Sequence, residues 1–499
     1  LSPVFGDENS AVSFDKELSE NNIVTIQPDS LRILHNPLTG WVLYASMGVD
    51  AADFWAQYDH MYIPELGHNV SVTDYAHTLY IRASWTDFNP QEDVYGWKID
   101  SNLRAYIEGA YQRNMRLAFR VVVDSRDKRT EFTPQFVKDA GAKGFMNKGK
   151  WSPYSDDPVF QKYYTKFVKA LAKDFNDPSK VEFIDGFGLG KWGEYHTMIY
   201  STGDDTPKKA VFDWVTDIYS QAFDKVPVVI NYHRWIGAGK DWVDDEHFAA
   251  DSEEMLEEAI KKGYSLRHDA FGMTTYYGSW ERRFAEKYRN ICPIIMEGGW
   301  IVKSHNYWQD PRGYRKNSHE DVRRGEFDDS KEAHVNMMDF RFGDTESWFK
   351  DAFDLVRRFL REGGYRLYPS EISLPLEVSK KTTPTIKHCW NNLGWGYCPT
   401  NIPQWNQKYK VAFALLDSET NEVRYTFVDT DTDLSKWIKG SPAEYVFGPD
   451  MSKVETGTYV WAVGLVDRSN KDLVGLDIAA KGDILDSGWL KLSKVSIKK

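Results

Sequence analysis

Residues 292–300 read CPIIMEGGW, a short apolar run that ends in a glutamate, two glycines and a tryptophan. An apolar run of this length, bounded by turn residues, is typical of a buried β-strand. Residues 183–196 read FIDGFGLGKWGEYH and place Glu194 a few residues beyond a second strand-like run. In both cases a carboxylate follows a strand that has few polar side chains of its own.

Eight runs of this kind occur before residue 368, separated by amphipathic stretches. The runs are Trp41–Ala45, Thr78–Ser84, Arg116–Val123, Phe183–Leu189, Val226–Tyr232, Ser265–Met273, Cys292–Glu297 and Val335–Phe340, and the clearest helical stretches are Asp100–Gln112, Val159–Asp174, Lys208–Phe223, Ser252–Lys262 and Ser347–Arg361. Eight strands, most of them followed by a helix, predict a (β/α)8 barrel. A doubly wound open sheet also alternates, but no strand here is followed by a glycine-rich phosphate turn.

The pattern changes after Tyr368, where helical periodicity ends and short alternating strands begin. These strands are Lys410–Leu416, Glu422–Val428, Gly457–Leu465 and Leu490–Val495, with polar turns between them. Such spacing predicts an all-β sandwich. We therefore expect an N-terminal arm over residues 1–22, the barrel over 23–368 and the sandwich over 369–499.

Composition limits the kind of partner. The chain has 499 residues and a net charge of -12, which argues against nucleic acid, and no apolar run is long enough for a membrane span. Aromatic residues make up 15%, with 19 Trp and 28 Tyr. Aromatic rings fill large cores, but they also stack on the apolar faces of sugars, and the excess favours a carbohydrate substrate. The 12 histidines show no pair at ligand spacing, so we expect neither a metal nor a cofactor.

The cysteines and the first residue bear on localisation. Cys389 and Cys398 flank a turn and either form a disulfide or remain free thiols, while Cys292 begins a buried strand. The chain begins with Leu1, which fits a leader that has been removed, and Asn69-Val70-Ser71 is a glycosylation triplet. We expect a secreted, periplasmic or cell-surface protein.

Glu194 and Glu297 follow the fourth and seventh predicted strands, which stand across the mouth of a barrel from each other. Two carboxylates that converge there can cleave a glycosidic bond: one protonates the leaving oxygen, and the other, ionised, attacks the anomeric carbon or activates water. Burial against Trp192 would raise the pKa of Glu194, as an acid requires, and a polar setting with an arginine would keep Glu297 ionised. Either residue taken alone also fits a solvated strand end or a helix cap.

This order and spacing resemble the large clan of (β/α)8 glycoside hydrolases that carry the acid/base at strand four and the nucleophile at strand seven. The resemblance covers about residues 30–365. Members of that clan have an asparagine before the acid/base, where this chain has Gly193. Residues 190–195, GKWGEY, also resemble the strand-four acid motif of β-amylases, which invert the anomeric configuration. Retention is the expected outcome, and inversion is the alternative.

Residues 36–41, NPLTGW, together with residues 192–196, WGEYH, and the all-β tail, are similar to a bacterial family of β-galactosidase-like barrels with a C-terminal sandwich. Membership would imply a hydrolase of glycans. In the larger clan an arginine late in strand two or three holds the nucleophile ionised, which favours Arg82 over Arg120. Arginines at such positions also form structural ion pairs inside barrels.

Further polar and aromatic residues near the strand ends are candidates for binding the sugar. For hydroxyl groups they are His196, Asn231, His233, His268, Asp269 and Arg341, and for stacking they are Trp85, Trp192, Trp300 and Trp308. Tyr276 or Tyr277 could bond the strand-seven carboxylate, and Asp339 and Arg341 could instead pair with each other. The long segment 304–331, with Tyr307, Arg312, Tyr314 and Arg315, could form a wall over the cleft.

The sequence thus predicts a glycoside hydrolase with a two-carboxylate mechanism, Glu194 as acid/base and Glu297 as nucleophile. The main alternative is a barrel that binds glycans without cleaving them. A third hypothesis makes the C-terminal sandwich the glycan-binding module and the barrel its scaffold.

Overall fold

The computed structural model describes residues 21–274, 276–301 and 319–499, and the chain forms two compact units. One unit comprises residues 38–364 with 402–404, and the other comprises the chain before residue 38 with 365–401 and 405–499. The sequence placed the boundaries at 22 and 368 instead. The difference arises because β1 (Asn22–Thr25) forms an antiparallel ladder with β14 (Leu367–Leu374), which assigns residues 22–37 to the β unit.

The first unit contains a closed barrel of eight parallel strands, which confirms the predicted fold class. In order round the ring they are β2 (Gly40–Tyr44), β5 (Ala76–Ser84), β6 (Arg116–Val122), β9 (Val181–Asp185), β10 (Val228–Asn231), β11 (Ser265–Phe271), β12 (Ile294–Gly298) and β13 (Met337–Asp339), which pairs with β2. Each of them overlaps a predicted strand. The strands are nearly all buried because side chains fill the barrel on one face and helices cover the other.

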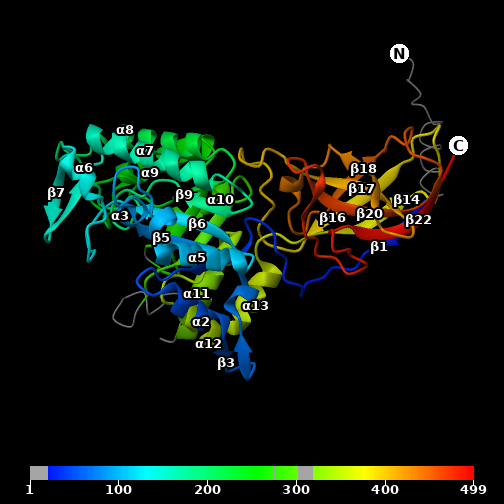
Figure 1. The fold of residues 1–499 in the computed structure, drawn as a ribbon, viewed down its shortest axis with the longest axis horizontal. Helices are drawn as coiled ribbons and strands as arrows, with labels where there is room; N and C mark the ends of the chain where they lie inside the picture. The colour runs from blue at the N-terminus through cyan, green and yellow to red at the C-terminus, as the bar shows by residue number, and fades with distance from the viewer. Residues whose placement is uncertain (1–20, 275, 302–318) are drawn as a thin grey trace, which may run out of the picture. The chain divides into compact units, whose positions relative to one another are not determined.

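Helices surround the barrel, and in Figure 1 α7, α8 and α9 run along one side while α11, α12 and α13 lie along another. The longer ones are α2 (Ala51–Asp59), α5 (Ser101–Gln112), α7 (Pro158–Phe175), α8 (Lys208–Ala222), α9 (Glu246–Lys261), α10 (Ser279–Tyr288), α11 (His319–Glu332), α12 (Thr345–Asp351) and α13 (Phe353–Glu362). Helix α7 shows why they form: Asp157 caps its first turn by accepting a bond from the Phe160 N–H, and Pro158 opens the helix. The predicted helix Ser347–Arg361 is broken at Ala352, whose φ of -145° is not helical.

Short elements extend the loops between the strands and helices. They are the hairpins β3 (Met61–Ile63) with β4 (His68–Val70) and β7 (Gly144–Asn147) with β8 (Lys150–Pro153), and the one-turn helices α3 (Trp85–Phe88), α4 (Gly96–Ile99) and α6 (Gln135–Asp139). The elements α3, α6, β7 and β8 follow the carboxyl ends of β5 and β6. These loops therefore belong to the end of the barrel where active sites of this fold lie.

The second unit consists of two sheets. One has the order β1, β14, β16 (Ile386–Asn392), β19 (Ala443–Phe447); the other has β15 (Glu377–Ser379), β22 (Leu490–Lys498), β20 (Gly457–Asp467), β17 (Tyr409–Asp417), β18 (Val423–Asp429), with β21 (Leu473–Leu476) beside β20. Phe413 of β17 contacts His388 and Phe447 of the first sheet, so side chains of the two sheets meet.

Two other expectations concern the cysteines and the membrane. Cys292, Cys389 and Cys398 are free thiols, and Cys389 and Cys398 do not form a disulfide in this structure. Within the described ranges, no helix combines the length and the apolar character needed to cross a bilayer.

Candidate active site

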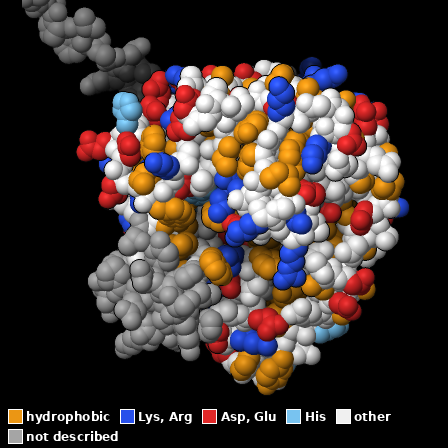
Figure 2. Space-filling model, turned by 90° about the vertical axis from the view of Figure 1, so that its left-hand side faces the viewer, with side chains coloured by type: hydrophobic (Ala, Val, Ile, Leu, Met, Phe, Trp, Pro, Cys, Tyr) orange, Lys and Arg blue, Asp and Glu red, His pale blue; other side chains and the backbone are white. Residues whose placement is uncertain are grey.

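A cavity of about 620 Å³ opens at the carboxyl ends of the barrel strands. Its lining residues are Arg82, Asp127, Trp192, Glu194, His196, Trp242, Asp269, Ala270, Met273, Tyr276, Glu297, Trp300 and Arg341. Figure 2 faces this end of the barrel and shows basic and apolar side chains around a hollow near its centre. The two predicted catalytic glutamates line the same cavity, together with seven of the residues proposed to bind substrate.

Glu194 lies in a tightly wound loop after β9. Trp192 and Tyr195 on either side have positive φ values of 61° and 63°, in a region that ordinary residues rarely adopt. Between them Gly193 has a φ of 72°, and a Cβ there would lie 3.2 Å from Val122 and 3.3 Å from Arg120. Close packing therefore explains why glycine stands where the clan has asparagine. Backbone strain of this kind is concentrated at functional sites in proteins.

The surroundings of Glu194 favour its protonated form. Its Oε1 accepts a bond of 3.0 Å from Arg120 and lies 3.6 Å from Arg82. Burial and the negative charge of Asp269, which is hydrogen-bonded to Glu194, nevertheless raise its pKa well above the usual value. The repulsion and the loss of hydration thus outweigh the two arginines, as the predicted acid requires.

Asp269 is the ionised partner in that contact. Both of its oxygens accept bonds from Arg120, at 2.9 and 3.0 Å, and Arg267 Nε lies 3.4 Å away. Burial alone would raise its pKa, but Arg120 and Arg267 hold the pKa far below the usual range. The sequence marked Asp269 only as a residue for binding hydroxyl groups, and its contact with the proposed acid is new.

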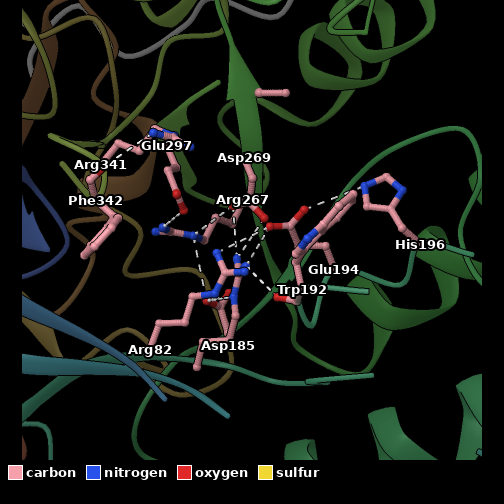
Figure 3. A network of polar contacts seen from close by, with 12 residues as sticks. Arg82, Asp185, Trp192, Glu194, His196, Arg267, Asp269, Glu297, Arg341 and Phe342 are labelled. Atoms are coloured by element: carbon pink, nitrogen blue, oxygen red, sulfur yellow. Dashed lines mark hydrogen bonds and ion pairs between the residues drawn. The ribbon is translucent and has the colours of Figure 1, made fainter. Parts of the chain in front are cut away.

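Glu297 at the end of β12 is bound by a different arginine from the one expected. Arg267 Nη2 donates to Glu297 at 2.7 Å and also lies 3.1 Å from Asp339, whereas Arg82 donates to Tyr44 at 3.3 Å. Arg82 is therefore not the hydrogen-bond partner of the strand-seven carboxylate. Figure 3 shows the side chains of Arg82 and Arg267 in the region of Glu194 and Glu297.

Glu297 has the nearby arginine that was expected, but burial acts on it as well. Its side chain is buried, and burial and the charge of Asp269 raise its pKa despite the opposing effect of Arg267, Arg120 and Arg82. The pKa of Glu194 is raised further. The order of the two values still suits an acid at Glu194 and an ionised group at Glu297.

A network of buried ion pairs lies beneath the cavity and contacts Glu194, Asp269 and Glu297. Arg120, which is fully buried and does not line the cavity, donates to Asp185 at 3.0 Å as well as to Glu194 and Asp269. Tyr80 also donates to Asp185, and the Arg267 guanidinium lies 4.3 Å above the Tyr80 ring. Sequence reasoning missed Asp185 and Arg267. Their signal was a charged residue inside an otherwise apolar strand.

His196 joins Glu194 to a second group of polar residues. Its Nδ1 bonds Asp241, its Nε2 bonds the Tyr276 hydroxyl at 2.5 Å, and it lies 3.8 Å from Glu194 Oε2. Tyr276 therefore does not bond the strand-seven carboxylate, and Tyr277 bonds Tyr232 instead, at 2.6 Å.

Three tryptophans contribute to the apolar part of the cavity. Trp192 and Trp300 were predicted, whereas Trp242, in the loop after β10, was not. Trp300 is 59% exposed and Trp242 51% exposed, and Trp242 stacks on His196 with ring centres 5.6 Å apart. Flat, exposed aromatic faces beside polar groups are suited to a sugar ring.

Several predicted residues lie elsewhere. Trp85 is fully buried and packs against Phe160 and Tyr164, because β5 leads directly into α3 and turns this side chain toward helix α7. Asn231, His233 and His268 are fully buried and do not line the cavity, and His233 stacks on His196 with ring centres 4.0 Å apart.

The remaining expectations concern the strand-eight end and the segment after β12. The Arg341 guanidinium lies 3.4 Å from Asp344, and the Asp339 carboxylate pairs with Arg267. The side chains of Asp339 and Arg341 therefore do not form the expected ion pair. Asp339 accepts a hydrogen bond from the backbone N–H of Arg341 instead. Trp308, Tyr307, Arg312, Tyr314 and Arg315 lie outside the described residues. In the part of the chain that the structure describes, no cluster of His, Cys, Asp and Glu is placed to hold a metal.

Comparisons with known proteins gave similarity in structure alone. No protein-family model and no curated protein sequence matches the chain. An endo-β-1,4-mannanase from Thermotoga petrophila aligns over 93% of this chain and 98% of its own, with 13% identity and a TM-score of 0.39. Endo-glycoceramidase II from Rhodococcus sp. aligns over 85% and 99%, with 11% identity and a TM-score of 0.39, and a Pseudomonas stutzeri endoglucanase over 68% and 97%, with 8% identity and a TM-score of 0.38. The chain is thus similar to (β/α)8 glycoside hydrolases at a level too low to carry an argument about its own activity.

Proposed function

We propose that the protein is a glycoside hydrolase in which Glu194 is the acid/base and Glu297 the nucleophile. The observation that supports this most directly is that the two carboxyl groups line one cavity and differ in environment. Burial and Asp269 favour a proton on Glu194, while Arg267 donates to Glu297 at 2.7 Å. A protonated and an ionised carboxyl group in one cleft are what cleavage of a glycosidic bond needs.

In the proposed first step Glu297 attacks the anomeric carbon as Glu194 gives its proton to the leaving oxygen. The bond between the anomeric carbon and that oxygen breaks, and a glycosyl ester on Glu297 forms. Negative charge then develops on Glu194, next to Arg120 and Arg82 at 3.0 and 3.6 Å. These arginines stabilise Glu194 more strongly after proton transfer than before it, which lowers the barrier.

In the second step Glu194, now ionised, accepts a proton from water as the water attacks the anomeric carbon. The ester bond to Glu297 breaks and the sugar leaves with retained configuration. His196, which lies 3.8 Å from Glu194 Oε2 and is itself bonded to Asp241, orients the glutamate without joining the covalent chemistry. The aromatic rings of Trp192, Trp242 and Trp300 offer the sugar a stacking surface.

A screen of plant and microbial polysaccharides tests the proposal. The wild-type protein should release reducing sugars from at least one of them, and Glu194→Gln and Glu297→Gln should each lower that rate by about 1,000-fold or more while the fold is unchanged. NMR of the first-formed product distinguishes retention from inversion. Polysaccharide binding without cleavage by the wild-type protein would establish the non-catalytic alternative.

A further inference from the structure

A second space of about 330 Å³, here called the cationic lobe, lies beside the cavity. Arg82, Glu297 and Arg341 line both spaces, so the two adjoin each other. The other charged or hydroxylated groups that face the lobe are Tyr44, Ser84, Asp87 and Lys128. A group bound there would lie directly beside the proposed nucleophile.

Three cations line the lobe: Arg82, Lys128 and Arg341. None of them has a carboxylate to itself among the residues that the structure describes. Lys128 forms no ion pair with any residue that the structure describes, and its Nζ lies 5.2 Å from the centre of the Phe132 ring. The carboxyl group nearest to Arg82, at 3.6 Å, belongs to Glu194, whose pKa is raised by burial and by Asp269 and which also accepts a bond from Arg120. Asp344 lies 3.4 Å from Arg341 but equally 3.4 Å from Arg323, so one carboxylate serves two guanidinium groups.

Two acidic groups, Glu297 and Asp87, also line the lobe. Glu297 accepts a bond of 2.7 Å from Arg267, a buried arginine that does not line the lobe. Burial raises the pKa of Asp87. Burial and the positive charge of Arg82 lower the pKa of Lys128 to about 8, the shift expected of an ammonium group close to another cation. The lobe is therefore lined by three cationic side chains and two acidic ones, and the acidic Glu297 already accepts a bond from an arginine outside the lobe.

We propose that the cationic lobe binds an acidic substituent of the sugar, a carboxylate or a sulfate ester, held by Arg82, Lys128 and Arg341. The inference rests on the proposed function and names its substrate class: glycans that contain uronic acids or sulfated sugars. Basic side chains around the hollow in Figure 2 agree with this distribution of charge. Guanidinium groups match the two oxygens of a carboxylate or sulfate, and charge-assisted bonds to them are strong in a partly enclosed site.

Binding of monosaccharides tests the proposal without any hydrolysis, since these sugars contain no bond to cleave. Glucuronate, galacturonate and glucose 6-sulfate are compared with glucose and galactose by ligand-observed NMR at constant ionic strength. We expect either the uronates or the sulfate ester, whichever binds better, to bind about 10-fold more tightly than the neutral sugars. This preference should fall as salt is added. The uronates and the sulfate ester form separate arms and show which acidic group the lobe takes.

Variants link the preference to the lobe. Lys128→Met and Arg341→Met should each lower the affinity for the acidic sugar by about 5-fold to 10-fold and leave the weak binding of neutral sugars unchanged. Lys261→Met removes the same charge from the exposed part of α9 and should change neither. The proposal is overturned if no acidic sugar binds better than its neutral counterpart, or if Lys261→Met weakens binding as much as Lys128→Met. A failure to cleave any glycan would affect the proposed function but not this result.

Discussion

Glu194 and Asp269 share a hydrogen bond at the floor of the cavity, although one follows β9 and the other lies in β11. A bond between two carboxyl groups requires one proton. Arg120 and Arg267 hold Asp269 ionised, so the proton belongs to Glu194. The pair thus separates a proton donor from a fixed negative charge.

The first prediction concerns Asp269→Asn. Removing its negative charge leaves Arg120 and Arg82 as the charged neighbours of Glu194, which lowers the pKa of that glutamate. Activity that needs protonated Glu194 should therefore be lost at lower pH. We expect the alkaline limb of kcat/KM to move down by about one pH unit or more.

This shift separates an electrostatic role for Asp269 from a merely structural one. A variant that only disturbs the fold lowers kcat/KM at every pH, and the pH of the alkaline limb stays the same. Circular dichroism of Asp269→Asn checks that the fold is retained. An unchanged limb in a folded variant would contradict the assignment of the proton.

The second prediction is the pH profile of the wild-type protein. Glu297 must be ionised, so the rate rises with pH through its pKa; Glu194 must be protonated, so the rate falls as pH passes through its pKa. Both values are raised above the usual 4.5, that of Glu194 further. A bell-shaped profile of kcat/KM with both limbs above pH 4.5 should result. An alkaline limb at or below pH 4.5 would show that Glu194 is not held protonated.

The third prediction concerns Arg267→Met. Arg267 is fully buried and lies within 3.8 Å of four carboxylates, those of Asp185, Asp269, Glu297 and Asp339. Its loss should lower the free energy of unfolding by about 3–5 kcal/mol, because it leaves buried negative charge without compensation. The pKa of Glu297 should rise as well, which moves the acid limb of activity to higher pH.

Urea unfolding and the pH profile measure the two effects of Arg267→Met. The control is Arg104→Met, which breaks an exposed pair with Glu108 on α5 and should leave both quantities unchanged. If the two variants are equally stable, the network beneath the cavity does not stabilise the barrel in the way described.

The fourth prediction compares two tryptophans that the sequence treated alike. Trp300 is 59% exposed at the cavity, so Trp300→Ala should raise KM about 3-fold to 10-fold with little effect on stability. Trp85 is buried against α7, so Trp85→Ala should lower the free energy of unfolding by about 3–5 kcal/mol. Thermal unfolding and steady-state kinetics of both variants decide the matter, and a stable Trp85→Ala with raised KM would reverse our placement of Trp85.

The fifth prediction concerns Gly193→Asn, which introduces the residue typical of the clan. At a φ of 72° asparagine is tolerated better than most residues, but its Cβ would approach Arg120 and Val122 to 3.3 and 3.2 Å. Displacement of Arg120 should lower kcat about 10-fold or more. Gly193→Ala carries the same Cβ without the amide and should show a similar loss of kcat. Full activity in both variants would mean that a Cβ at residue 193 fits beside Arg120 and Val122 without displacing Arg120.

The barrel could be predicted from the sequence because its signal is local and repeated. Each strand is a short apolar run, and each of the eight overlaps a strand of the ring. The strand β1 could not be found in this way. Its four residues, Asn22–Thr25, alternate between partly buried and exposed, and only pairing with a strand more than 340 residues away makes them a strand.

The site was predictable as far as it depends on strand ends. Glu194, Glu297 and Trp300 follow strands, and the carboxyl ends of parallel strands meet at one end of a barrel. Which arginine meets which carboxylate depends on the direction of side chains inside the barrel, and sequence spacing does not give it. Arg82 was therefore matched to Glu297, where Arg267 donates, and Trp85 was placed at the cleft although α3 directs it toward α7.

The central claim is that Glu194 and Glu297 carry different steps of one reaction, and chemical rescue by azide tests it most directly. With an aryl glycoside whose leaving group needs no proton, Glu194→Ala should still form the glycosyl ester, and azide should restore turnover and yield a glycosyl azide of retained configuration. Glu297→Ala with azide should give the inverted glycosyl azide. The account would be contradicted if both variants gave a glycosyl azide of the same configuration, or if both hydrolysed the substrate at the wild-type rate.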